Sequence, residues 1–147
     1  MKRAYRIFLA VIPLLSCSIN GSAQDLTGIW RGYFIGVGGD QYKYEVQIDQ
    51  SKSNFLNGVT YSYLEKQFYG KATFTGNFSK GSKNALVQEI KTVEVKMAFG
   101  SVSCIMKCKL QYVQSGKEEF LEGTFESTHE KDSYGAKKGE DCGSGTV

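Results

Sequence analysis

Histidine and cysteine are the residues of this sequence best suited to acid–base, nucleophilic or metal chemistry. The 147 residues include one histidine and four cysteines. His129 follows a predicted strand and stands among charged residues, so its imidazole is expected to be solvated rather than to act as a general base. A zinc site needs closely spaced ligand pairs, which the cysteines do not provide. We therefore predict no catalytic set, no metal site and no cofactor, and expect a protein that is not an enzyme.

Carboxylates are concentrated in residues 118–132. A pair of carboxylates can hydrolyse a glycosidic bond, and a cluster of them can bind calcium. Here Glu122 and Glu126 share one face of a predicted strand, while Leu121 and Phe125 share the other. The acidic side is therefore expected to be a solvated outer face.

Three cysteines follow the N-terminal segment, Cys104, Cys108 and Cys142. In an oxidising compartment at least two of them are expected to form a disulfide. Cys104 and Cys108 are four residues apart in a predicted strand, which separates their Cα atoms by roughly 13 Å, well beyond the ~7 Å limit for a disulfide. Cys142 is therefore expected to pair with either Cys104 or Cys108. The remaining cysteine is expected to be a small buried side chain rather than a reactive thiol.

Tyrosines carry most of the functional information. Tyr42, Tyr44, Tyr61 and Tyr112 lie within predicted strands. A tyrosine that points into a barrel must hydrogen-bond its hydroxyl group to a neighbour, a water or a ligand. These four side chains are therefore predicted to form the wall of an amphipathic cavity. The alternative is that they fill a narrow barrel or cover its outside.

A β-sheet positions these residues, because apolar and polar residues alternate along the chain from Leu26 onward and no long window has helical periodicity. In Gln41–Asp49, for example, Tyr42, Tyr44 and Val46 share one face. Eight strands in sequence order, joined by tight turns, predict an all-β, antiparallel, up-and-down barrel closed on itself. The predicted strands are Thr27–Ile35, Gln41–Asp49, Gly58–Leu64, Phe68–Phe74, Ala85–Met97, Cys104–Val113, Phe120–Ser127 and a short strand from Gly145.

Turns and irregularities are predicted between and within these strands. The apolar alternation slips within residues 85–97, which predicts a β-bulge near Lys91. Residues 133–143 are rich in glycine, lysine and serine and are expected to form a loop. Because the last strand reaches Val147 soon after it begins, the chain is expected to be a fragment or the strand to be completed in another way. Turn residues occur at Gly36–Gly39, Ser51–Asn54, Gly76–Asn77, Lys80–Ser82 and Ser115–Lys117.

The first 23 residues have the parts of a secretion signal: a basic start, an apolar run and small residues before a cleavage site after Ala23. The apolar run is about nine residues, shorter than the roughly 20 that a membrane-spanning helix needs. We therefore expect an exported protein, periplasmic or secreted and not integral to the membrane, with residues 24–147 as a single barrel domain. Cleavage before Cys17 is the alternative, and it would leave a lipid-anchored protein.

The net charge of +3 comes from this N-terminal segment. Removal of Lys2, Arg3 and Arg6 leaves 15 basic residues against 15 acidic ones. A neutral chain lacks the excess of lysine and arginine that neutralises phosphates. Nucleic acid is therefore not expected as a partner.

The sequence Leu26-Thr27-Gly28-Ile29-Trp30 resembles the first-strand motif of the calycins, the group of lipocalins, fatty-acid-binding proteins and avidins. The resemblance implies an eight-stranded barrel in which Gly28 permits a close approach and Trp30 forms the floor. Avidins that bind biotin present several tryptophans, whereas this chain has one, so biotin is not the expected ligand. The chain also resembles uncharacterised lipocalin-like proteins that bacteria export, which implies a fold and no known activity.

The expected function is binding of a small apolar or amphipathic molecule without catalysis, with Trp30 as the floor and Tyr42, Tyr44, Tyr61 and Tyr112 as the wall. The alternative is a solid barrel that acts as an interaction module through its loops or outer face. The two expectations differ in cavity volume, because a ligand pocket reaches roughly 300 Å³.

Overall fold

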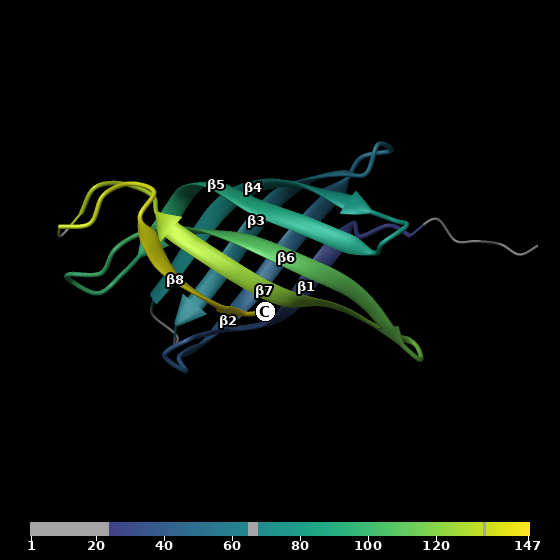
Figure 1. The fold of residues 1–147 in the computed structure, drawn as a ribbon, viewed down its shortest axis with the longest axis horizontal. Coiled ribbons are helices and arrows are strands. Elements are labelled where there is room, and N and C mark those ends of the chain that lie inside the picture. The colour runs from purple at the N-terminus through teal and green to yellow at the C-terminus, as the bar shows by residue number, and fades with distance from the viewer. Residues whose placement is uncertain (1–23, 65–67, 134) are drawn as a thin grey trace, which may run out of the picture.

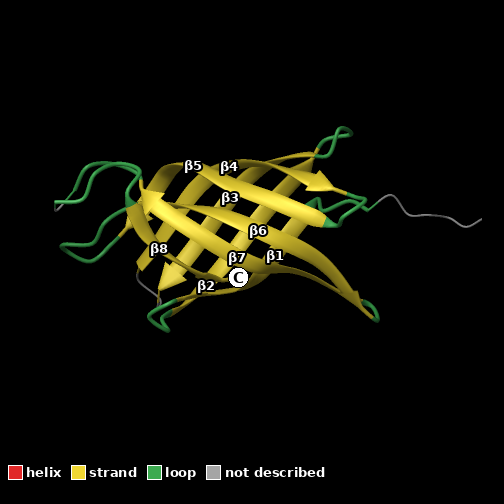
Figure 2. Ribbon diagram, in the orientation of Figure 1, coloured by secondary structure: helices red, strands yellow, loops and turns green. Residues whose placement is uncertain are grey.

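The protein forms a closed barrel of eight antiparallel strands (Figure 1). The structure is a computed structural model that describes residues 24–64, 68–133 and 135–147. These residues form strands and loops and no helix (Figure 2), so the predicted all-β, up-and-down barrel is confirmed. The predicted signal peptide, including Cys17, lies outside the described residues. The strands are β1 (Gly28–Gly36), β2 (Gln41–Gln50), β3 (Phe55–Leu64), β4 (Phe68–Ser79), β5 (Asn84–Lys96), β6 (Cys104–Ser115), β7 (Glu118–His129) and β8 (Asp141–Thr146).

Each strand pairs with the next one in sequence, and β8 pairs with β1 to close the ring. The alternation of β2 shows why the sequence folds this way, because Tyr44, Val46 and Ile48 are buried while Lys43 and Asp49 are exposed. The closing β1–β8 ladder is short. It consists of two residue pairs, Ile35 with Thr146 and Gly36 with Gly145.

The predicted strand boundaries differ most from the structure at the end of β4 and at the start of β8. Gly76-Asn77 is not a turn but lies inside β4, where Gly76 pairs with Leu56 of β3 and with Val87 of β5. A Cβ atom at this position would collide with the carbonyl oxygen of Leu86, so glycine is required by close strand approach rather than by turn geometry. β8 begins at Asp141 rather than at Gly145, so the end of the predicted loop 133–143 belongs to the sheet.

The irregularity predicted near Lys91 is confirmed, and it consists of two bulges in β5. The ladder with β4 skips Ile90 and Val93, which lie on either side of Lys91 and are about half-exposed. The bulges change which side chains face inward along β5. Ala85, Val87 and Glu89 point inward by regular alternation before the bulges, and the first bulge places Thr92 rather than Lys91 on the inner side.

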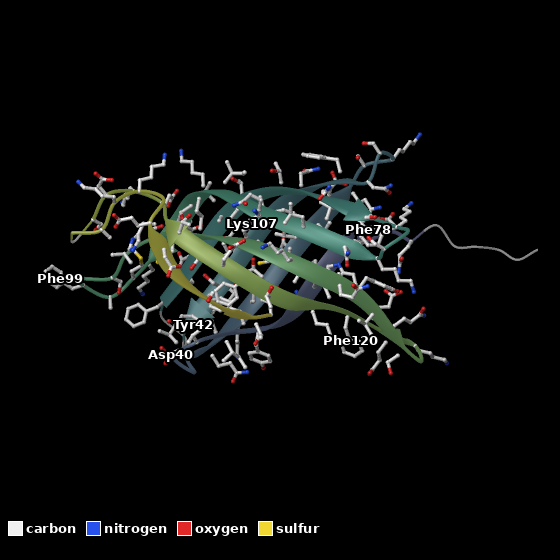
Figure 3. All side chains as sticks on the ribbon, viewed as in Figure 1. Asp40, Tyr42, Phe78, Phe99, Lys107 and Phe120 are labelled. Carbon is white, nitrogen blue, oxygen red and sulfur yellow. A yellow bond between two sulfur atoms is a disulfide. The ribbon has the colours of Figure 1, made fainter. Side chains whose placement is uncertain are left out.

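One end of the barrel is filled and the other is open. Figure 3 shows Phe78 and Phe120 at the filled end and Tyr42 and Phe99 at the open end. At the filled end the indole of Trp30 donates a hydrogen bond of 2.9 Å to the backbone carbonyl of Leu26. The core there is built from buried apolar side chains, among them Leu26, Leu56, Phe74, Phe78, Val87 and Leu110.

Candidate functional site

A cavity of about 560 Å³ occupies the open end of the barrel, and we call it the mouth cavity. Small inward-facing residues on β3 and β4 leave this space, since Thr60, Ser62, Gly70 and Ala72 line it. Further along β4, the bulky Phe74 fills the equivalent position in the core. More of the cavity wall is apolar than polar. The main apolar side chains of the wall are Phe34, Tyr42, Phe68, Val95, Met106 and Phe125.

Tyr42 alone of the five residues predicted to surround a ligand lines the mouth cavity. Its ring stacks on Phe34, with centroids 4.7 Å apart and planes 6° from parallel. Tyr44 faces inward from the same strand but is buried in the core. Trp30 and Tyr112 lie at the filled end, where their rings meet edge to face at 6.4 Å. Trp30 and Tyr112 therefore belong to the packed core, away from the cavity.

Tyr61 was expected to face the interior, and this expectation is wrong. Thr60 and Ser62 face the cavity, so strand alternation places Tyr61 on the outer face. There its ring stacks on Tyr63 at 6.2 Å, and the ammonium group of Lys71 lies 5.1 Å above it. This side chain therefore contributes to an outer aromatic surface.

A carboxylate that the sequence analysis did not single out lies where the mouth cavity meets the core. Glu89 lines the cavity and is only 6% exposed. Its Oε1 accepts hydrogen bonds from Thr60 Oγ1 at 2.6 Å and from the Tyr44 hydroxyl at 3.2 Å. Its Oε2 accepts one from the backbone N–H of Met106 at 2.7 Å. Three strands therefore supply donors to one carboxylate.

Burial raises the pKa of Glu89 above its ordinary value of 4.5. The hydrogen bonds from Thr60, the Met106 backbone and Tyr44 work in the opposite direction, whereas the negative charge of Glu130 adds to the increase in pKa. The other titratable groups that face Glu89 are Tyr44 and Cys108. Burial raises the pKa of Tyr44 well above 10 and that of Cys108 to about 12. Neither group changes its charge near neutral pH.

Glu89→Gln is expected to remove a pH dependence from the stability of the protein. Because the pKa of Glu89 is raised on folding, its contribution to stability is fully present below pH 4.5 and is lost as the pH rises through the folded pKa. Within that window the wild type should lose about 1.4 kcal/mol per pH unit relative to the variant. Urea unfolding of both proteins between pH 4 and pH 8 measures the difference. A constant difference across this range would contradict the prediction.

Glu89 and Glu130 also close a gap in the barrel wall. In the described residues the β5–β6 ladder ends at the pair Gln88–Lys107, so β5 and β6 separate toward the open end. Beyond that point Glu89 binds the Met106 N–H, and Glu130 accepts hydrogen bonds from the Thr92 backbone at 2.8 Å and from Ser103 Oγ at 2.7 Å. Burial opposes ionisation of Glu130, but the hydrogen bonds from Ser103 and Thr92 outweigh it and lower the pKa of this group. Side-chain carboxylates thus replace backbone carbonyls along this seam.

The predicted disulfide is confirmed, and Cys104 rather than Cys108 is the partner of Cys142. The Cα atoms of the bonded pair are 6.3 Å apart. The ladder between β7 and β8 pairs Ser127 with Gly143 and Thr128 with Asp141, so Cys142 is a bulged residue. Both half-cystines line the mouth cavity. The disulfide therefore joins β6 to the start of β8 at the open end.

Cys108 is a buried free thiol, as predicted. Its pKa of about 12 makes it unreactive at neutral pH. His129 was expected to be solvated, and this expectation is wrong, because it is half-buried at the end of β7 and pairs with Cys104 in the β6–β7 ladder. The ligand atoms of Cys104, His129 and Cys142 lie within 4.8 Å of one another. The two sulfur atoms are bonded to each other, so they do not offer thiolate ligands to a metal.

Comparison with known proteins found no family model, no curated sequence and no solved structure that matches this chain. The part of the chain that the structure describes holds no helix long and apolar enough to cross a membrane. The mouth cavity and its carboxylate are therefore the features from which a function can be argued.

Proposed function

We propose that the protein is an exported, calycin-like barrel that binds a small apolar or amphipathic molecule in the mouth cavity without changing it chemically. The cavity volume of about 560 Å³ carries the proposal. Ligand pockets of proteins have volumes of about 300–1,000 Å³ and combine an apolar wall with few polar groups. The mouth cavity has this character, since aromatic and aliphatic side chains surround Glu89 and a few hydroxyl groups.

Two further observations support the other parts of the proposal. The Cys104–Cys142 disulfide is typical of proteins that fold in an oxidising compartment. The closed eight-stranded, up-and-down barrel, which begins with Gly28 and Trp30, has the architecture that the calycin resemblance implies. Trp30 packs against the core at the filled end, so the ligand would enter from the opposite end.

Nile red, a neutral dye that fluoresces in apolar surroundings, tests the proposal. Ala72→Phe is expected to weaken dye binding at least about 10-fold. Ala72 lines the cavity on β4, between β3 and β5, so the added ring would fill part of the space that the dye needs. Thr73→Phe is the matched control, since Thr73 is the next residue of β4 and points away from the cavity. The dissociation constants of both variants are measured by fluorescence titration.

The result that would overturn ligand binding is an absence of dye uptake by the wild type, or equal binding by the Ala72→Phe and wild-type proteins. The second candidate function, an interaction module, would then gain support. Exposed apolar side chains on and after β5 that do not line the cavity favour that alternative, namely Ile90, Val93 and Phe99.

A further inference from the structure

Glu89 is a carboxylate inside the barrel without a paired cation. The ion pairs among the described residues are all at the surface, and none of them includes Glu89. A buried carboxylate that lacks a counter-charge is costly, even when hydrogen bonds satisfy part of it. A positive charge that enters the cavity with a ligand would offset this desolvation cost.

The hydrogen bonds of Glu89 leave room for one more donor. An ionised carboxylate has about four acceptor positions. Thr60 and Tyr44 occupy two on Oε1, and the Met106 backbone occupies one on Oε2. Glu89 lines the mouth cavity, so a molecule bound there would be within reach of this carboxylate.

The rest of the cavity favours a hydrocarbon body rather than a second charged group. Phe34 and Tyr42 form a stacked pair on one side, and Phe125 meets Phe34 edge to face with centroids 5.2 Å apart. Lys71 and Lys96 contribute to the cavity wall, but the ammonium group of Lys71 lies over the outer ring of Tyr61, and Lys96 is the exposed last residue of β5. Glu89 is the buried charged group of the inner cavity and would repel an anionic headgroup.

We propose, on the basis of the proposed binding function, that the mouth cavity selects a cationic amphiphile whose protonated amine donates a hydrogen bond to Glu89 while its hydrocarbon part contacts the apolar wall. A charge-assisted hydrogen bond in a buried site should favour such a ligand about 10- to 100-fold over an uncharged analogue of the same length. The selected chemistry is a single primary ammonium group on an aliphatic chain.

Three probes of equal chain length test this proposal: octylamine, 1-octanol and octanoate. Isothermal titration calorimetry on the wild-type protein at pH 7.5 is expected to give the order octylamine, octanol, octanoate from tightest to weakest. Glu89→Gln should bring octylamine to the affinity of octanol. Glu94→Gln is the matched control, because Glu94 is exposed on the outside of the same strand and should leave the preference unchanged.

The pH dependence of binding to the wild type tests the same contact without a substitution. Octylamine keeps its proton between pH 5 and pH 8, so its affinity should rise with pH as Glu89 ionises, whereas that of octanol should not. Tyr44 and Cys108 keep their protons over this range, and the lowered pKa of Glu130 keeps it ionised.

The outcomes separate this inference from the function on which it rests. Equal binding of octylamine and octanol by the wild type, or a preference that survives in Glu89→Gln or disappears in Glu94→Gln, would overturn the selection of a cation and leave ligand binding intact. Failure of all three probes and of Nile red to bind would overturn both proposals.

Discussion

Replacing Cys104 and Cys142 together with alanine is expected to lower the free energy of unfolding by about 4 kcal/mol. The disulfide joins residues 38 positions apart, and the chain-entropy model assigns a stabilisation of this size to a loop of that length. It also holds the start of β8 against β6, at the end of the barrel where β8 meets β1 through two residue pairs. Urea unfolding of the oxidised wild type and the double variant at one pH measures the loss.

Two controls separate the crosslink from the loss of side-chain volume. Cys108→Ala removes a buried thiol that is in no disulfide and should cost only about 1 kcal/mol. A reducing agent should lower the stability of the wild type to that of the double variant and leave the double variant unchanged. If the reducing agent has no effect on the wild type while its thiols become titratable, the stabilising role of the crosslink is refuted.

Phe74→Ala is expected to cost about 3–5 kcal/mol of stability, the usual range for a fully buried phenylalanine. Phe74 is 2% exposed and lies in the core at the filled end. It lies directly across from Gly58 in the β3–β4 ladder, and its ring covers this glycine, since a Cβ atom on Gly58 would be 3.0 Å from Phe74 Cε1. The truncation would therefore leave a void both in the core and over the glycine.

Phe55→Ala is the matched control for this variant. Phe55 is also a strand phenylalanine, on the neighbouring β3, but it is 46% exposed. Its truncation should cost less than about 1 kcal/mol. Equal losses for the two variants, measured by thermal and urea unfolding, would show that the filled end of the barrel is not the packed core described above.

The fold could be predicted because alternation is a local property of the sequence. In β2, buried Tyr44, Val46 and Ile48 follow one another at every second position, and such a pattern admits only a half-buried strand. The choice of Cys104 as the disulfide partner could not be predicted, since it depends on a bulge in β8 that turns Cys142 toward β6. Bulges follow from pairing between strands, which a single sequence does not display.

The candidate site was harder to predict because its inward-facing residues are polar or small. Glu89 follows Ala85 and Val87 at every second position of β5, so plain strand alternation places it in the barrel. The apolar residues Leu86 and Ile90 instead suggest the opposite face of the strand as the inward one. Tyr61 was predicted to line the cavity because it is aromatic, but the cavity exists because its neighbours Thr60 and Ser62 are small and face inward. A glutamate among apolar strand residues, close to a predicted bulge, is the sequence signal that would have pointed to Glu89.

The shortness of the β1–β8 ladder determines the order in which the barrel can assemble. Every other ladder joins strands that are adjacent in sequence, and such hairpins can form early because the chain between their strands is short. The pairs Ile35–Thr146 and Gly36–Gly145 join segments about 110 residues apart. The entropic cost of closing such a long loop is high, and two residue pairs offset little of it. Ring closure is thus expected to be the last step of folding. Until it occurs, β1 and β8 are free sheet edges, and the rate of closure sets how long a folding chain can pair with another copy of itself.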